Sequence, residues 1–242
     1  MCRTRLLNGT PITMRECDTV TFKYDPFGRR IYKSTSAGTS VFAYDGDNLV
    51  EETNATGGVV ARYSQGLNID EPLAMLRSST TSYYQADGLG SVTSLTNAAG
   101  TAAQNYTYDS FGNIIASTGS LVNSFRYTGR EWDTETSLYY YRARYYDPDA
   151  GRFLSEDPIR YLGGDRNFYR YVWGATPNLR DPSGLLGMGL SLGAGGFLGG
   201  GPGVGGSASI GSMWFLGALP GRRWLCDCRR LCEAARHMQA IR

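Results

Sequence analysis

The chain has 242 residues and a formal net charge of +2, from 24 Lys and Arg against 22 Asp and Glu. This near-neutral balance gives no electrostatic footprint for nucleic acid. A single histidine, His237, excludes multi-histidine metal centres and argues against most histidine-dependent hydrolytic triads. Hydrophobic residues make up 41% of the chain, which argues against wholesale disorder.

Residues 1–17 are expected to form a lead-in without a secretory signal, because no apolar stretch follows the first basic residues. From residue 18 to 124 a sequence motif recurs, in which aromatic-x-Tyr-Asp is followed by glycine. Successive marker tyrosines are separated by 20, 19, 21, 24 and 19 residues. They are Tyr24, Tyr44, Tyr63, Tyr84, Tyr108 and Tyr127. A period near twenty corresponds to two short strands and two turns, so we expect one β-hairpin per repeat.

The pattern within each repeat also favours strands. In residues 20–24, Val-Thr-Phe-Lys-Tyr, apolar and aromatic side chains occupy every second place. An aspartate with glycine shortly after it is typical of a turn, because the carboxylate accepts bonds from nearby backbone N–H groups and glycine adopts the left-handed conformation. We therefore expect each Tyr-Asp pair to mark a strand end and a turn, not a catalytic pair.

Isolated hairpins are marginal in water, so the repeats are expected to pair into one continuous antiparallel sheet. A sheet that began near residue 18 would expose an unpaired edge strand. The chain is therefore interpreted as a fragment, or the end, of a longer repeat protein.

Residues 125–185 are denser in tyrosine and arginine and hold the most specific motif. It runs Ser-Leu-Tyr-Tyr-Tyr-Arg-Ala-Arg-Tyr-Tyr-Asp-Pro-Asp-Ala-Gly-Arg-Phe-Leu-Ser-Glu-Asp-Pro over 137–158 and ends in Asp-Pro-Ser-Gly-Leu over 181–185. This segment closely resembles the RHS repeat-associated core domain, and the recurring Tyr-Asp motifs before it resemble the YD repeats of the same family of bacterial proteins. The likeness covers about residues 18–185.

The resemblance implies an all-β fold, in which antiparallel hairpins form a spiralling sheet that closes into a shell plugged by the core domain at 125–185. Such shells enclose a C-terminal polymorphic toxin or effector, carried in cis. The family also implies upstream RHS repeats, an immunity protein or a secretion-system spike as partners, and a secreted or cell-surface location. No nucleic-acid partner is expected. The alternative function is a cell-surface adhesion or carbohydrate-binding module that uses exposed Tyr and Asp rows without proteolysis.

The family likeness further implies autocatalytic cleavage by an aspartyl mechanism after Leu185, with Asp157 and Asp181 as the acid–base pair. Two carboxylates that share one proton can activate water and protonate the reacting group. Arg144 matches the family's arginine upstream of the first Asp-Pro, where a fixed cation would hold a carboxylate ionised; Arg152 is the weaker candidate. The opposing interpretation is that both Asp-Pro pairs are ordinary turns. Where the family commonly has glycine, this chain has Arg160, which could alter the first turn or point to solvent.

Arg142, Arg166 and Arg170 alternate with tyrosines, and stacking or pairing on a strand face explains them without a catalytic role.

Residues 186–221 are interpreted as a glycine-rich linker, since thirteen of the 35 residues at 186–220 are glycine. A transmembrane helix and a membrane-active hairpin are the alternatives, and the glycine density argues against the helix. Residues 222–242 are expected to form a short basic helix, the remnant of a toxin or a small effector. Its Cys226, Cys228, Cys232 and His237 could bind zinc, but their spacing matches no standard zinc motif, so neither a metal nor another cofactor is assigned.

Overall fold

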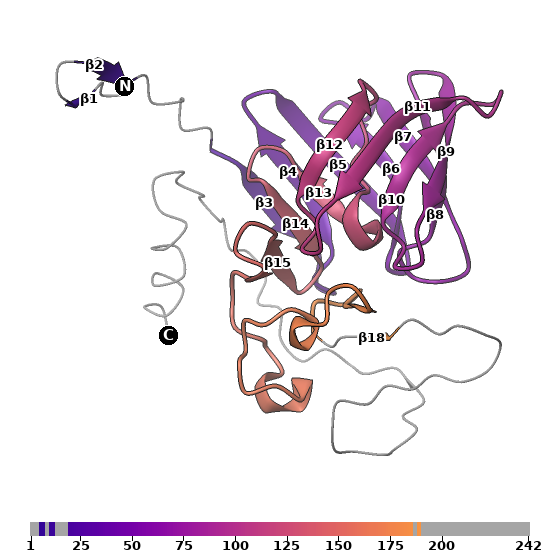
Figure 1. Ribbon diagram of the computed structural model, residues 1–242. Helices are drawn as coiled ribbons and strands as arrows, with labels where there is room; N and C mark the ends of the chain where they lie inside the picture. The colour runs from indigo at the N-terminus through magenta and orange to yellow at the C-terminus, as the bar shows by residue number, and fades with distance from the viewer. Residues whose placement is uncertain (1–4, 8–9, 13–18, 186–187, 190–242) are drawn as a thin grey trace.

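The computed structural model describes residues 5–7, 10–12, 19–185 and 188–189 (Figure 1). Strands β1 (Arg5–Leu7) and β2 (Thr10–Ile12) pair with each other within the segment expected to be a lead-in. The proposed linker lies outside the described residues, apart from Met188–Gly189, and so do the proposed C-terminal helix and its cysteines.

Ten antiparallel strands follow one another in chain order in a single sheet, called here the large sheet. They are β3 (Thr21–Tyr24), β4 (Arg30–Thr35), β5 (Gly38–Asp45), β6 (Asn48–Asn54), β7 (Val59–Gln65), β8 (Pro72–Arg77), β9 (Thr80–Ala86), β10 (Val92–Thr96), β11 (Ala102–Tyr108) and β12 (Ile114–Gly119). Each strand pairs with its neighbours in the chain, with β3 and β12 at the two edges, so the predicted all-β arrangement of antiparallel hairpins is confirmed.

Five of the six marker tyrosines lie on alternate strands from β3 to β11, which bears out one hairpin per repeat. The sixth, Tyr127, does not begin another hairpin of the sheet. It lies in the short 3-10 turn η1 (Tyr127–Gly129) and is buried. Thr128 has a positive φ of 49° and is also buried, and the large sheet ends at β12.

The predicted turn chemistry recurs at five places. A side-chain oxygen of Asp25, Asn54, Asp87, Asn97 or Asp109 accepts the backbone N–H groups two and four residues later. The glycine three residues after each of these side chains has φ between 78° and 91°. The aspartate of the repeat therefore forms a turn, as expected from the sequence.

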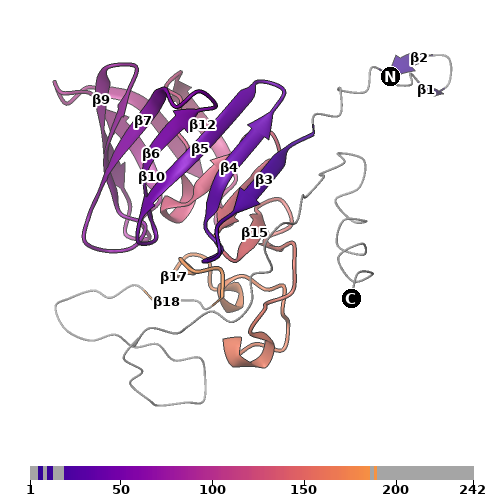
Figure 2. The ribbon, with the colours of Figure 1, turned by 180° about the vertical axis from the view of Figure 1, so that it is seen from behind.

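The large sheet curls so that its early and late strands face each other across a shared interior (Figures 1 and 2). Apolar side chains from β5 to β11 meet there in one cluster, and Phe125 contacts the rings of Tyr63 and Tyr84 edge-on. The burial alternates along β7, β9 and β11; in β7, for example, Ala61 and Tyr63 are buried and Arg62 is exposed. Inward-facing rings thus bend the sheet around a common core.

A second sheet, called here the small sheet, lies against both ends of the curl. Its strands are β13 (Glu131–Asp133), β14 (Leu138–Tyr141), β15 (Arg144–Asp147) and β16 (Arg152–Phe153). The chain continues through η2 (Arg160–Gly163), η3 (Val172–Gly174) and β17 (Leu179–Arg180), which pairs with β18 (Met188–Gly189). Among the described residues the helical segments are these three short turns, and none could cross a membrane.

Both faces of β14 are covered, which explains why four consecutive residues are buried. On one face Tyr140 contacts the first hairpin, because its hydroxyl accepts the Arg30 N–H at 3.0 Å. On the other face the Tyr139 hydroxyl donates to the carbonyl of Gly112, in the β11–β12 turn, at 2.9 Å. The small sheet therefore joins the first and last hairpins of the large sheet.

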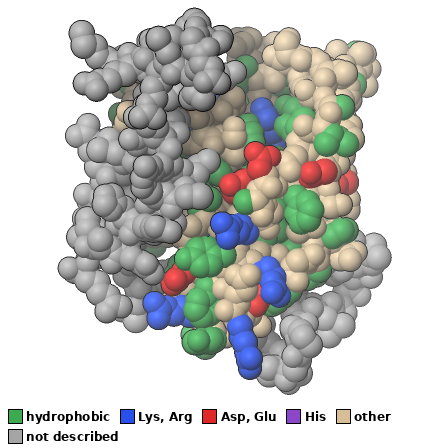
Figure 3. All heavy atoms as spheres, turned by 60° about the vertical axis from the view of Figure 1, so that its left-hand side comes forward, with side chains coloured by type: hydrophobic (Ala, Val, Ile, Leu, Met, Phe, Trp, Pro, Cys, Tyr) green, Lys and Arg blue, Asp and Glu red, His purple; other side chains and the backbone are tan. Residues whose placement is uncertain are grey.

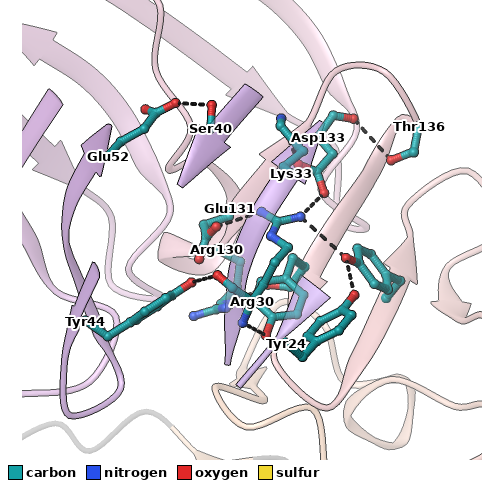
Figure 4. Close-up of polar contacts among 12 residues, drawn as sticks. Tyr24, Arg30, Lys33, Ser40, Tyr44, Glu52, Arg130, Glu131, Asp133 and Thr136 are labelled. Atoms are coloured by element: carbon teal, nitrogen blue, oxygen red, sulfur yellow. Dashed lines mark hydrogen bonds and ion pairs between the residues drawn. The ribbon is translucent and has the colours of Figure 1, made fainter. Parts of the chain in front are cut away.

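A buried cluster of charges completes this joint (Figure 4). The guanidinium of Arg30, on β4, binds Asp133 and also binds Glu131 at 2.7 Å, both on β13. The pKa of Arg30 is raised above its ordinary value by the nearby Asp133, Tyr145 and Glu131, although burial opposes this. The ion pairs are thus held in a region from which water is excluded.

Replacing Arg30 with Ala should destabilise the protein by about 3–5 kcal/mol, because two buried carboxylates lose their shared cation. Urea unfolding followed by circular dichroism measures the change. The matched control is Arg62→Ala, which removes an exposed ion pair with Glu51 and should cost about 1 kcal/mol or less. Equal losses in the two variants would contradict the proposed importance of the buried cluster.

Candidate active site

The three residues expected to form the aspartyl site meet at one point. Arg144 begins β15, Asp157 follows β16, and Asp181 follows β17. One guanidinium nitrogen, Nη2 of Arg144, lies 3.1 Å from Asp157 Oδ2 and 3.5 Å from Asp181 Oδ2. All three residues are buried. Although the aspartates are 24 positions apart, the fold brings one oxygen of each to the same cation.

The other oxygen of each carboxylate holds a local turn. Asp157 Oδ1 accepts the Ile159 N–H at 2.9 Å. Asp181 Oδ1 accepts the N–H groups of Gly184 and Leu185 at 2.9 and 3.1 Å and the hydroxyl of Ser183 at 3.0 Å. In both aspartates Oδ1 accepts the hydrogen bonds of a local turn, as the turn interpretation expects. Oδ2 of each aspartate instead faces Arg144.

Arg144 is held on all sides. Its Nε donates to the carbonyl of Gly184, its Nη1 donates to the carbonyl of Phe168 at 3.0 Å, and its guanidinium lies 3.6 Å from the ring centre of Phe153. Burial lowers the pKa of Arg144 from its ordinary value, and the two carboxylates oppose that effect. The cation is thus fixed in position between the aspartates. Arg152, the weaker candidate for this role, is exposed on β16.

The surroundings of Asp157 shift the pKa of its carboxyl group upward. Burial raises the pKa of this carboxyl, and the charge of Asp181 adds to the rise, while the Ile159 N–H and Arg144 oppose it. A raised pKa beside a second carboxylate is the arrangement in which a pair can share one proton.

The proposed cleavage point adjoins this pair. A β-carbon placed on Gly163 would lie 3.0 Å from Asp157 Oδ2 and 3.4 Å from the carbonyl oxygen of Leu185, so both oxygens face the same position. A cavity of about 20 Å³ is lined by Arg144, Asp157, Asp181 and Leu185, among others. This volume is enough for one water molecule. Residue 186, on the other side of the bond, lies outside the described residues.

Arg160 closes the first turn in a left-handed backbone conformation. Its φ is 48°, a left-handed value that suits glycine, and its N–H donates to the Asp157 carbonyl at 3.0 Å. Its side chain is 63% exposed and lies 4.0 Å from Glu156. The long side chain therefore points to solvent, the second of the two possibilities considered for it.

Sequence reasoning missed the residues that orient the site. Phe168 and Ser183 contribute a carbonyl and a hydroxyl, and Gly163 leaves the space between Asp157 and Leu185. Ser183 stands inside the Asp-Pro-Ser-Gly-Leu motif, so its position was visible. No sequence signal marks a backbone carbonyl such as that of Phe168.

The hairpins of the large sheet form a curled meander, and the tyrosine-rich small sheet joins the first of them to the last. This architecture defines the wall of a YD-repeat shell. The family model described as Teneurin YD-shell matches residues 12–171, more than half of the chain, and the chain belongs to this family. The chain is thus a segment of an RHS/YD-type shell, as the resemblance of its motifs implied.

Curated relatives share this segment. The chain is 34% identical over 174 residues to the tRNA3(Ser)-specific nuclease WapA of Bacillus spizizenii, covering 68% of this chain and 7% of the relative. It is 31% identical over 200 residues to the double-stranded DNA deaminase toxin A of Burkholderia cenocepacia, covering 69% of this chain and 14% of that protein. The chain therefore spans a small part of the length of these relatives.

The crystal structure of TcdB2-TccC3-TEV has the same fold. It superposes with a TM-score of 0.56 at 23% identity, over 68% of this chain and 9% of that one.

The close packing at Gly184 provides a test of the site's geometry. Gly184 has φ +72°, and an added β-carbon would lie 2.1 Å from the Tyr141 carbonyl oxygen. Gly100 has a similar φ of +78° with nothing within 4 Å. Gly100→Ala should therefore cost about 1–2 kcal/mol from backbone strain alone, and Gly184→Ala about 1–3 kcal/mol more from the clash. Chemical unfolding of both variants measures the difference, and equal losses would contradict close packing at residue 184.

Proposed function

We propose that this chain forms the closing end of a shell that holds a C-terminal cargo in cis, and that it cuts itself after Leu185. The observation that carries the proposal is the position of Asp157 Oδ2 and Asp181 Oδ2 on one guanidinium nitrogen of Arg144. The site adjoins Leu185, the residue before the proposed cut. The protein as a whole is proposed to be secreted or displayed at the cell surface.

The relatives support a shared, non-toxic role for this segment. One is named for cleavage of tRNA and another for deamination of DNA, yet both match this chain over about two thirds of its length. A region common to two proteins that are named for different chemistries is the natural candidate for a role that both share. The common region is therefore proposed to serve as the container, with the variable activity elsewhere in each protein. An immunity protein and a secretion-system spike are further proposed partners of the whole protein.

The proposed reaction is hydrolysis of the peptide bond between Leu185 and residue 186. Asp157, whose pKa is raised, donates its proton to the Leu185 carbonyl oxygen. Asp181 accepts a proton from the attacking water, and the three donors on its Oδ1 stabilise its negative charge. Water adds to the carbonyl carbon and gives a geminal diol. As the C–N bond breaks, one hydroxyl of the diol returns a proton to Asp157 and the proton on Asp181 passes to the departing amine, so a carboxylic acid and an amine are released. Arg144 keeps the pair at a single shared proton by holding one carboxylate ionised.

Substituting either aspartate should abolish the cut. In the full chain, Asp157→Asn and Asp181→Asn should each remain intact, because a carboxamide neither shares a proton nor accepts one from water. The wild type should give a product that ends at Leu185. Intact-mass measurement distinguishes these outcomes.

The matched control is Asp109→Asn. Asp109 forms the same kind of turn away from the site, and Asn54 and Asn97 already form that turn in this chain. This variant should be cut normally. A folded wild-type chain that stays intact, with folding checked by circular dichroism, would refute self-cleavage and favour the adhesion or carbohydrate-binding alternative.

The cut should also depend on pH. Burial and the neighbouring Asp181 raise the pKa of Asp157, so its proton is retained to higher pH than on an exposed aspartate. The cleavage rate should fall as the pH rises through this raised pKa, because both carboxylates are then ionised and no proton remains to share. Rates measured across the acidic and neutral range, with circular dichroism at each pH, test this. A rate that increases steadily toward alkaline pH would contradict the roles given to the pair.

A further inference from the structure

Three consecutive residues, the two of the β14–β15 turn and Arg144 at the start of β15, hold three consecutive carbonyls of the segment that leads to Leu185. Arg142 Nη1 donates to the carbonyl of Pro182. The Ala143 N–H donates to the carbonyl of Ser183 at 3.2 Å, and Arg144 Nε donates to the carbonyl of Gly184. The turn therefore sets the path of the backbone just before the proposed cut.

Arg142 differs from its two neighbours because it also binds the large sheet. Its Nη2 donates to Asp70 Oδ1 at 2.8 Å and to the carbonyl of Asp47 at 3.0 Å, and its Nη1 lies 3.2 Å from Asp70 Oδ2. Asp47 lies in the β5–β6 turn and Asp70 in the β7–β8 loop. One guanidinium thus joins two hairpins of the large sheet to the segment before Leu185.

The contact between Arg142 and Asp70 is more than charge neutralisation. Asp70 is buried, and Arg130 already binds its Oδ1. Asp70 therefore has a buried cation without Arg142. What Arg142 adds is a link between Asp70 and the carbonyl of Pro182. Arg142 lies in the two-residue turn between β14 and β15 and has φ 54°. This backbone conformation fixes the direction in which its side chain leaves the turn. The planar fork of arginine donors serves Asp70 and a carbonyl in one fixed geometry, whereas the ammonium of lysine carries its donors on a single nitrogen without that fork.

We propose that Arg142 is a positioning residue that couples assembly of the large sheet to self-cleavage. The inference rests on the proposed function and adds its regulation. When the β5–β6 and β7–β8 hairpins have folded against the small sheet, Arg142 places the Pro182 carbonyl and the residues after it opposite the aspartates. Before that, the segment before Leu185 lacks this anchor, so the cut follows closure of the shell wall and the cargo is not released early.

The test follows the full chain during cell-free synthesis with a labelled pulse, and scores the product ending at Leu185 over time. Arg142→Ala should slow the cut by about 10- to 100-fold, as expected for a misplaced reacting group. Arg142→Lys keeps the charge and most of the side chain but should also be slow. The matched control, Arg62→Ala, removes an exposed arginine that pairs with Glu51 of the large sheet, away from the proposed cut, and should be cut at the wild-type rate.

Guanidinium ion separates positioning from stability. Added well below denaturing concentrations, it should restore several-fold of the lost rate to Arg142→Ala by occupying the space between Asp70 and Pro182, whereas equal sodium chloride should not. A purely structural role would give no rescue, since guanidinium lowers stability. If Arg142→Ala does not fold, the cleavage rate of folded Arg142→Lys decides whether the coupling holds.

Wild-type cleavage rates in folded Arg142→Ala or Arg142→Lys, or a slowed Arg142→Ala that guanidinium does not restore, would overturn the coupling while leaving self-cleavage intact. An uncut wild type, by contrast, refutes the proposed function itself.

Discussion

Buried arginine–carboxylate pairs between the two sheets are the interaction on which the rest of this structure depends. The strands of the small sheet have two to four residues, too few for a stable sheet of its own. It is fixed instead to the large sheet by Arg30 with Glu131 and Asp133, and by Asp70 with Arg130. Such pairs are costly to desolvate, and their directional hydrogen bonds favour one relative placement of the sheets.

That placement determines the chemistry of the candidate site. Arg144 belongs to the small sheet, whereas its two carboxylate partners lie on the irregular segments that follow. Each aspartate uses one oxygen to hold its own turn and directs the other to the shared cation. Local turn formation and acid–base chemistry are therefore compatible in one side chain, and the turn fixes the carboxylate that the reaction would need. On the described part of the face in Figure 3, basic, acidic and hydrophobic side chains lie side by side.

Sequence reasoning was reliable where structure depends on neighbouring residues. The alternation around Phe22 and the Asp-to-Gly spacing at residues 25–28 predicted strands and turns that the protein contains, because both patterns act over a few residues. Its limit is visible at Tyr127, whose local pattern is a weaker copy of the repeat. The backbone bond from the Val92 N–H to the Arg126 carbonyl and the burial of Tyr127 hold this segment in the interior instead of in an eleventh strand.

The amino-acid sequence by itself determined the antiparallel hairpins, their period and the identity of the family, because strand alternation, turn residues and a long motif are all written in contiguous residues. It also named Asp157, Asp181 and Arg144 as candidates. Only the tertiary structure decided that two carboxylate oxygens meet on one guanidinium nitrogen, that Arg160 points to solvent, and that Arg142 joins the large sheet to Pro182. These contacts link residues up to 95 positions apart, and their geometry depends on how the whole sheet curls, which no local pattern encodes.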